Sequence, residues 1–208
     1  MSYICLIANQ NGIAAAGDSR LTFQPEALRL HLDRGRKVFS DQDQGLVWAC
    51  CGLTIFGGVN YCWLSEHILR QKNRSLSSRL NQITGALRRA TAAQHRVSRK
   101  NSTFTLLLGQ VRDGGAVVHV LDVVNGEATH KVLDGPVLVH AGWSASLRQS
   151  KPAVSDYAND SLGQLIDLVK KRCLWAIHKD STLAQQDRKH RQTVGGSVRF
   201  VFLLIRHP

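Results

Sequence analysis

The amino-acid sequence predicts an α+β protein in which helices flank two β-sheets. Three observations indicate this class. Short runs rich in β-forming residues recur along the chain, Asn-Gly pairs mark tight turns between some of them, and two long segments carry apolar residues at helical spacing. The predicted order is strands, two helices, strands, one or two helices and a closing strand. Two sheets flanked by helices bury an apolar face of every one of these elements.

The first fifty residues predict two hairpins. Asn11-Gly12 is a strong turn signal between two apolar runs, because both residues tolerate positive φ angles. The polar residues Asp18, Ser19 and Arg20 end the second run, and residues 41–45 form the turn of the second hairpin. The predicted strands are Tyr3–Ala8, Ile13–Gly17, Lys37–Ser40 and Leu46–Cys51.

Three segments predict helices. The first runs from Gly52 to about Arg70, and the second begins at a cap formed by Ser77 or Ser78. The second helix carries an apolar stripe, with basic residues on the opposite face. The stripe is Leu80, Ile83, Leu87 and Ala90, and the basic face is Arg88, Arg89, His95 and Arg99. The third helix, Asp160–His178, is apolar nearly all round, so we expect it to lie between other layers.

A strand meander separates the second helix from the third. Turns at residues 113–115 and at Asn125-Gly126 divide it, and one further strand closes the chain. The predicted strands are Thr103–Val111, Val117–Val123, Ala128–Leu133, Val137–His140 and Arg199–Ile205. The sequence contains no internal repeat, linker or low-complexity segment, so we expect one domain over residues 1–208.

Composition excludes several classes of protein. A hydrophobic fraction of 43% and a charged fraction of 20% are typical of a globular chain. The longest apolar stretches are far shorter than a membrane span, and the N-terminus has no secretion-signal pattern, so we expect a cytoplasmic protein and no membrane. The five cysteines and nine histidines are dispersed without metal-ligand spacing, which predicts no metal and no cofactor.

The net charge of +12 is concentrated in one region. From His67 to Arg112 the chain has no Asp or Glu but ten Lys and Arg residues. Such a stretch could contact the phosphates of a nucleic acid. It has no aromatic residue between Trp63 and Phe104, which argues against stacking on bases. A solvated basic face, or one that meets an acidic subunit surface, is the favoured interpretation.

Ser2 is a candidate nucleophile. Initiator methionine is normally removed before a residue as small as serine, and removal would give Ser2 a free α-amine. The unperturbed pKa of an α-amine is about 7.7–8.0, so this group can act as general base toward its own hydroxyl without a histidine. A serine in second position is common, and alone it predicts little.

The residues downstream of Ser2 resemble those of proteasome β subunits, a family of N-terminal-nucleophile (Ntn) hydrolases. The resemblance rests on the Asn-Gly hairpin, the run Ala-Gly-Asp-Ser-Arg at 16–20, the lysine before the second hairpin and the glycine after it. It is densest over residues 2–58 and returns over residues 180–205. The resemblance implies a four-layer αββα sandwich of the Ntn-hydrolase type.

The resemblance also implies roles for five residues. Ser2 stands where the family has its N-terminal threonine, and Lys37 lies beside that nucleophile. Asp18 holds the lysine, and Arg20 belongs to the same Asp-Ser-Arg motif. Gly52 matches the glycine whose N–H helps form the oxyanion hole, at a spacing one residue longer than usual. A lysine ammonium favours the alkoxide of a nearby hydroxyl, and a glycine N–H can face an oxyanion unobstructed.

Later positions match the family in part. Asp180 matches an aspartate that orients the region of the N-terminal amine, and Val-Gly-Gly-Ser at 194–197 precedes a closing strand as in the family. Ser144 lies where the family has an active-site serine, but here Trp143 directly follows the glycine. The favoured interpretation of Ser144 is therefore an N-cap before residues 145–149. Asp180 fits a helix-end polar residue equally well.

The joint pattern predicts hydrolysis of amide bonds, in peptides or in a small molecule, through an acyl-serine intermediate. Singly, Asp18 with Arg20 fits a surface ion pair and Lys37 fits a solvated charge, so the prediction rests on their common spacing. The resemblance further implies a homo-oligomer, with a ring as one form. Two alternatives stay open: a catalytically inactive proteasome-like structural or assembly protein, and a basic nucleic-acid-binding module on the same scaffold.

Overall fold

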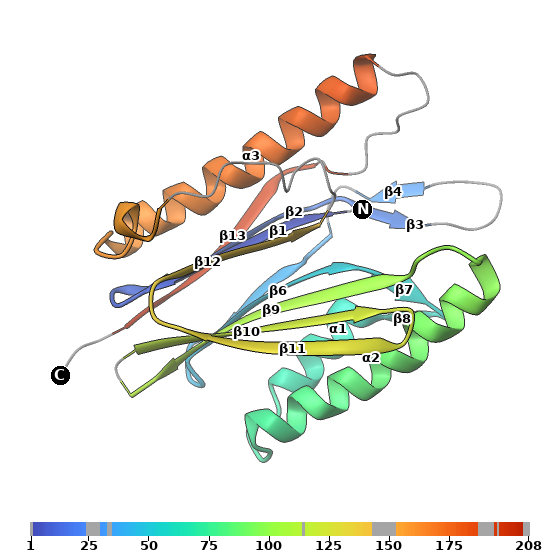
Figure 1. The fold of residues 1–208 in the computed structure, drawn as a ribbon, viewed down its shortest axis with the longest axis horizontal. Helices are drawn as coiled ribbons and strands as arrows, with labels where there is room; N and C mark the ends of the chain where they lie inside the picture. The colour runs from blue at the N-terminus through green and yellow to red at the C-terminus, as the bar shows by residue number, and fades with distance from the viewer. Residues whose placement is uncertain are drawn as a thin grey trace.

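The computed structural model describes residues 2–23, 30–32, 35–113, 115–142, 153–186, 194 and 196–205 (Figure 1). Its longer helices and strands follow the predicted order. The strands are β1 (Tyr3–Asn9), β2 (Gly12–Asp18), β3 (Leu21–Phe23), β4 (Leu30–Leu32), β5 (Val38–Asp41), β6 (Leu46–Gly52), β7 (Ile55–Phe56), β8 (Val59–Asn60), β9 (Thr103–Arg112), β10 (Gly115–Val124), β11 (Glu127–Asp134), β12 (Val137–Gly142) and β13 (Val198–Leu204). The helices are α1 (Tyr61–Leu69), α2 (Leu76–Ser98), the 3-10 turn η2 (Val154–Asp156) and α3 (Leu162–Gln186).

The first sheet has the strand order β12-β1-β2-β13 and is antiparallel throughout. Every residue of β1 and β2 is buried, because both faces of this sheet are covered. Successive side chains of a strand point to opposite faces, so Tyr3, Cys5 and Ile7 lie on one side of β1 and the residues between them on the other.

The second sheet has the order β11-β10-β9-β6-β5 and is also antiparallel. The β10–β11 hairpin turns at Asn125-Gly126, where both residues have positive φ as the sequence predicts. The fold is therefore a mixed α+β arrangement built on antiparallel sheets, which confirms the predicted class at that level.

Three apolar clusters hold these elements together. One joins α3 to the first sheet through residues such as Val169, Cys173 and Cys5. The second lies between the two sheets, where Ile4 and Leu6 of β1 meet β6 and β9. The third joins the second sheet to α1 and α2. In Figure 1 α3 covers the first sheet on one side, while α1 and α2 cover the second on the other. Each fully buried large aliphatic side chain contributes about 1.5–3 kcal/mol.

The predicted helix from Gly52 to Arg70 is wrong in its first half. Gly52 belongs to β6, and residues 55–60 form the short β7–β8 hairpin. Gly57 and Gly58 both have positive φ, so they form a turn and cannot continue a helix. Helix α1 begins only after Asn60, whose side chain accepts hydrogen bonds from two backbone N–H groups of the first turn.

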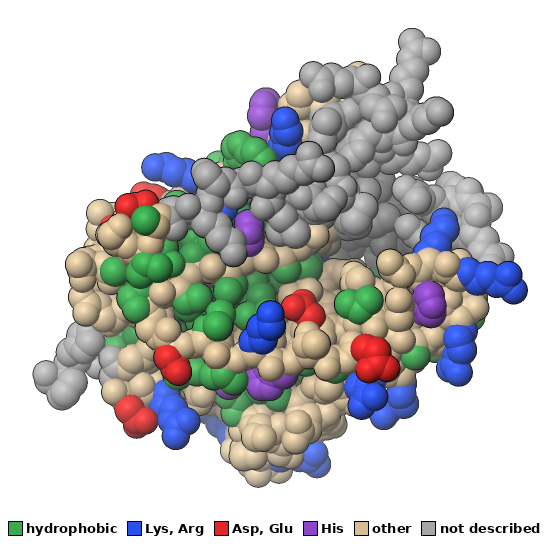
Figure 2. Space-filling view, in the orientation of Figure 1, with side chains coloured by type: hydrophobic (Ala, Val, Ile, Leu, Met, Phe, Trp, Pro, Cys, Tyr) green, Lys and Arg blue, Asp and Glu red, His purple; other side chains and the backbone are tan. Residues whose placement is uncertain are grey.

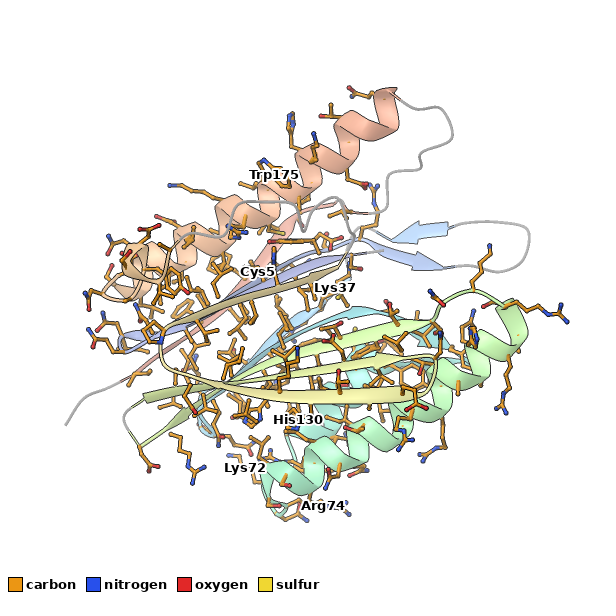
Figure 3. The ribbon with its side chains drawn as sticks, viewed as in Figure 1. Cys5, Lys37, Lys72, Arg74, His130 and Trp175 are labelled. Carbon is orange, nitrogen blue, oxygen red and sulfur yellow. The ribbon has the colours of Figure 1, made fainter. Side chains whose placement is uncertain are left out.

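The other two helices differ from prediction at their ends and faces. Ser75, not Ser77 or Ser78, caps α2, and its side chain accepts a hydrogen bond from the backbone N–H of Ser78. Helix α3 was expected between layers, but it lies on the outside, with Leu174 57% exposed and Trp175 39% exposed. Figure 3 shows Trp175 on the side of α3 away from the sheet.

Small residues on β2 let the first sheet approach its neighbours closely. A Cβ atom on Gly12 would lie 2.8 Å from Leu162 of α3. A Cβ atom on Gly109 of β9 would lie 2.7 Å from Ile13 of β2. The candidate site lies at the other end of β2, at Asp18. Among the described helices, none combines the length and apolar character needed to cross a membrane.

Candidate active site at the N-terminal serine

The structure brings Ser2, Lys37 and Asp18 into direct contact. Lys37 Nζ donates a hydrogen bond of 2.7 Å to Ser2 Oγ. The same Nζ lies 3.0 Å from Asp18 Oδ2, in an ion pair buried from solvent at both ends. Ser2 itself is 5% exposed. Figure 3 shows Lys37 between the two sheets, so the ammonium is held inside the protein.

Lys37 uses its full hydrogen-bonding capacity at this position. Besides Ser2 and Asp18, its ammonium donates to the backbone carbonyl of Arg20. An ammonium has three N–H donors and no lone pair. These three partners fix the position of Lys37 Nζ beside the serine oxygen.

Asp18 links the lysine to the start of β1. Its Oδ1 accepts from the backbone N–H of Tyr3 at 2.7 Å, and its Oδ2 accepts from Lys37 and from the N–H of Arg20 at 3.3 Å. Tyr3 directly follows Ser2, so the carboxylate positions both the lysine and the backbone that carries the serine. Four acceptor sites on a carboxylate permit these bonds simultaneously.

Local sequence places these groups. Asp18 is the last residue of β2 and lies beside Tyr3, the first residue of β1. The last β1–β2 pair at this end is Ile4 with Gly17, and the Asp18 carboxylate accepts the Tyr3 N–H just beyond it. Lys37 precedes β5 and is anchored by the bond from Cys50 N–H to its carbonyl. The hairpins predicted from the Asn-Gly turn and from residues 41–45 therefore bring the three side chains together.

Two glycines permit close backbone approaches around this centre. Gly142, at the end of β12, has φ +136°, and a Cβ there would lie 1.9 Å from the carbonyl oxygen of Ser2. Gly52, the last residue of β6, has φ +103°, and a Cβ there would lie 2.2 Å from the carbonyl oxygen of Thr103. Neither position accepts a side chain without movement of backbone.

Two buried thiols lie within electrostatic range of the Lys37–Asp18 ion pair. Burial raises the pKa of Cys51 to about 12, although the nearby Lys37 charge opposes the shift. Burial also raises the pKa of Cys173 of α3, with the Asp18 carboxylate adding to the effect. The thiols are therefore neutral at physiological pH, so they are poor nucleophiles beside the serine. Cys51 directly precedes Gly52, which brings the end of β6 within electrostatic range of Lys37.

The remaining predicted residues are placed differently. Arg20 contributes its backbone N–H and carbonyl to the centre, through Asp18 and Lys37. Asp180 is fully buried on α3, and its Oδ2 accepts from the N–H of Val194 at 2.7 Å. This hydrogen bond fixes the backbone at Val194, four residues before β13 begins. Ser144 lies outside the described residues.

Sequence reasoning missed two features. Ser19 and Ser197 exchange hydrogen bonds that tie the end of β2 to the start of β13: Ser19 N–H donates to Ser197 O at 3.0 Å, and Ser197 N–H donates to Ser19 Oγ at 2.9 Å. Arg172 of α3 is 7% exposed, and its charge lowers the pKa of the Tyr3 hydroxyl and of the Cys5 thiol, against the larger raising effect of burial. Its place in the 165-169-172-176 stripe of that helix was the available signal.

No cluster of three or more His, Cys, Asp or Glu side chains suited to a metal occurs in the described part of the chain. The histidines are less dispersed than the sequence suggested, because His119 and His130 stack on the outer face of the second sheet. The basic stretch is partly paired with acids from elsewhere: Lys72 with Asp43, and Arg70 with Glu66.

Comparison with known proteins identifies the fold. No protein-family model matches the sequence, and no curated protein matches it. The structure is similar to that of Anbu (ancestral beta-subunit) from Yersinia bercovieri, with a TM-score of 0.52 and 18% sequence identity. The match covers 97% of this chain and 80% of that chain. The chain has a proteasome-like fold. At 18% identity this similarity shows the fold alone, so the chemistry of the site follows from its residues.

Proposed function

We propose that this protein is an N-terminal-nucleophile hydrolase that cleaves amide bonds, with peptides as its substrate class, on a four-layer αββα scaffold of the Ntn-hydrolase type. Ser2 is the nucleophile once Met1 has been removed. The observation that carries the proposal is the 2.7 Å contact between Ser2 Oγ and the buried ammonium of Lys37, itself paired with Asp18. A buried charge aimed at a hydroxyl oxygen is costly for folding, and activation of that oxygen explains it.

The base in this mechanism is the α-amine of Ser2. Lys37 has no lone pair while its three N–H groups are donated, so it stabilises the alkoxide and does not take the proton. The amine accepts the hydroxyl proton as Oγ bonds to the substrate carbonyl carbon. The tetrahedral intermediate then expels the leaving amine, which receives that proton, and an acyl-serine remains. Water attacks the ester in the same way, releasing the acid and restoring Ser2.

The supporting roles are part of the same proposal. The N–H of Gly52 serves the oxyanion, which the positive φ of this residue and the proximity of Cys51 to Lys37 support. Asp18 positions the lysine, while Arg20 and Asp180 hold the surrounding backbone. We further propose a cytoplasmic homo-oligomer, with a ring as one form, and no cofactor.

Intact-mass spectrometry with a serine-directed acylating inhibitor tests the proposal. We expect untreated protein to lack Met1 and treated protein to gain one adduct. The adduct is absent from Ser2→Ala, while Ser75→Ala, which removes a helix cap far from Lys37 in the sequence, keeps it. Retained Met1 without any adduct would reject the hydrolase and favour an inactive proteasome-like structural protein.

A further inference from the structure

The outer face of the second sheet changes from apolar to polar along its length. Facing α2, strand β9 presents Leu106 and Leu108 and then Gln110 and Arg112, in strict alternation. Strand β10 changes in the same way, from Val123 and Leu121 to His119, and β11 from Ala128 to His130. Positions that strand periodicity assigns to an apolar helix–sheet contact thus carry polar side chains at one end.

A cavity opens where this change occurs. It has a volume of about 490 Å³ and lies between the first half of α2 and strands β9, β10 and β11. That volume falls within the range of sites for small molecules. Leu80 and Leu121 form apolar wall, and the polar groups stand opposite them. The polar lining consists of Ser77, Asn81, Thr84, Arg88, Gln110, Arg112, His119 and His130.

The two histidines are held as a pair. Their rings stack with centroids 5.3 Å apart, and His119 Nδ1 lies 3.1 Å from His130 Nε2. His119 Nε2 is buried and has no partner among the described residues. In the hydrogen bond between the two rings the tautomer decides which nitrogen donates, His119 Nδ1 or His130 Nε2. The Nδ1 of His130 takes no part in this contact, and because His130 is exposed this nitrogen can meet a ligand without breaking the pair. Figure 3 labels His130 at this edge, and Figure 2 shows histidine on the surface there.

The electrostatic character of the cavity is positive. Arg88 spends its Nε–H on the carbonyl of Gly126, and Arg112 makes an exposed ion pair with Asp113 through its Nε. The terminal nitrogens of both guanidinium groups are not used in these contacts. No carboxylate belongs to the described lining, although Asp113 pairs with Arg112 and the charge of Asp134 acts on His119. The first turn of α2, which supplies Ser77, contains no acid either.

We propose that this cavity binds a small organic anion, with its carboxylate or phosphate between Arg88, Arg112 and His130 and its apolar body against Leu80 and Leu121. Guanidinium forks suit both acid groups, because they donate paired N–H bonds to two oxygens. The apolar wall excludes a bare inorganic ion as the best ligand, since such an ion leaves that wall in water. The cavity is separate from the Ser2 centre, which lies between the two sheets.

Isothermal titration calorimetry on the full chain tests this site. The probes are phenyl phosphate, phenylacetate, inorganic phosphate and benzyl alcohol. We expect the two aromatic anions to bind, inorganic phosphate to bind more weakly and benzyl alcohol not to bind. Preference between phenyl phosphate and phenylacetate distinguishes a phosphate ester from a carboxylate as the natural ligand class.

Three variants locate the binding. Arg112→Ala and His130→Ala each weaken binding of the preferred anion by about tenfold, as loss of one charge-assisted hydrogen bond predicts. Arg89→Ala, on the same helix but outside the lining, removes an equal charge and leaves the affinity unchanged. Equal loss in Arg89→Ala, no loss in the cavity variants, or no binding of either aromatic anion at millimolar concentration would each overturn the proposal. Ser2→Ala should bind normally, so failure of the hydrolase proposal leaves this result intact.

Discussion

Replacement of Lys37 by methionine removes the central charge of the candidate site while keeping the length of the side chain. In the wild-type protein Lys37 and Asp18 are 1% and 0% exposed, with 3.0 Å between Nζ and Oδ2. Two unit charges at that distance attract by about 5.5 kcal/mol at an effective dielectric constant of about 20. Lys37→Met leaves the Asp18 carboxylate buried with only part of its hydrogen bonds.

The expected loss follows from that geometry. Breaking one partner out of a buried pair costs about 3–5 kcal/mol in the free energy of unfolding. The backbone N–H groups of Tyr3 and Arg20 still donate to Asp18, which favours the lower end of the range. Asp18→Asn removes the stranded charge, so the double variant should be less destabilised than the sum of the singles, by about 1–3 kcal/mol.

Urea unfolding followed by circular dichroism measures these values, with Lys72→Met as the matched control. Lys72 pairs with Asp43 at 2.8 Å, but both side chains are largely exposed, so we expect its loss to leave stability unchanged within error. If Lys37→Met unfolds at the same urea concentration as Lys72→Met, the ion pair does not hold the site together and the electrostatic argument is refuted.

Three further predictions concern backbone, anchoring and pH. Gly142→Ala forces a Cβ against the carbonyl of the candidate nucleophile, so it should abolish adduct formation in the mass assay. Gly135→Ala carries the same kind of positive-φ strain but has open space around its Cβ and should retain adduct formation. Asp180→Ala removes the acceptor for Val194 N–H and should lower the free energy of unfolding by about 1–3 kcal/mol in urea titrations. Burial, aided by the neighbouring imidazole, lowers the pKa of His119 from 6.5, so stability should fall as pH drops below that value and His119→Leu should flatten the dependence.

Each of these has a contradicting result. Normal labelling of Gly142→Ala would mean that the close contact of β12 with the Ser2 carbonyl is not needed for adduct formation. An Asp180→Ala variant as stable as wild type would mean that water replaces the carboxylate at Val194. A pH dependence that survives His119→Leu would assign the effect to another group, because only a group with a depressed pKa in the folded state destabilises it in that window.

Much of the site was predictable from local pattern. The predicted β1–β2 hairpin forms, although its loop is Gln10-Asn11 and not Asn11-Gly12, because Gly12 pairs with Asn9 as the first residue of β2. The register of this hairpin brings the end of β2 beside the residue after Ser2. The position of Lys37 could be predicted from the second hairpin alone, because Lys37 directly precedes β5 and its side chain points into the space between the sheets. The resemblance to the proteasome family supplied what pattern alone could not, namely which of many charged residues to combine.

Other features depend on packing that periodicity does not encode. Helix α3 appears apolar all round, yet Leu174 and Trp175 face outward, because only one stripe of a helix can contact a sheet. The β7–β8 hairpin escaped notice because its turn, Gly57-Gly58, interrupts a segment that otherwise looks helical. The His119–His130 contact was within reach, since the two-residue turn at 125–126 sets a register in which His130 lies opposite Leu121, and His119, two residues away on the same face, is its diagonal neighbour.

The free amine of Ser2 is the claim on which the account depends most. Two forms of the same chain test it: one made with a cleavable N-terminal fusion left in place, and one in which cleavage leaves Ser2 as the first residue. Both are treated with the acylating inhibitor, and peptide mass spectrometry locates any adduct. We predict a single adduct on Ser2 in the cleaved form and none in the fused form. Equal labelling of both forms, or labelling of neither, would contradict the mechanism.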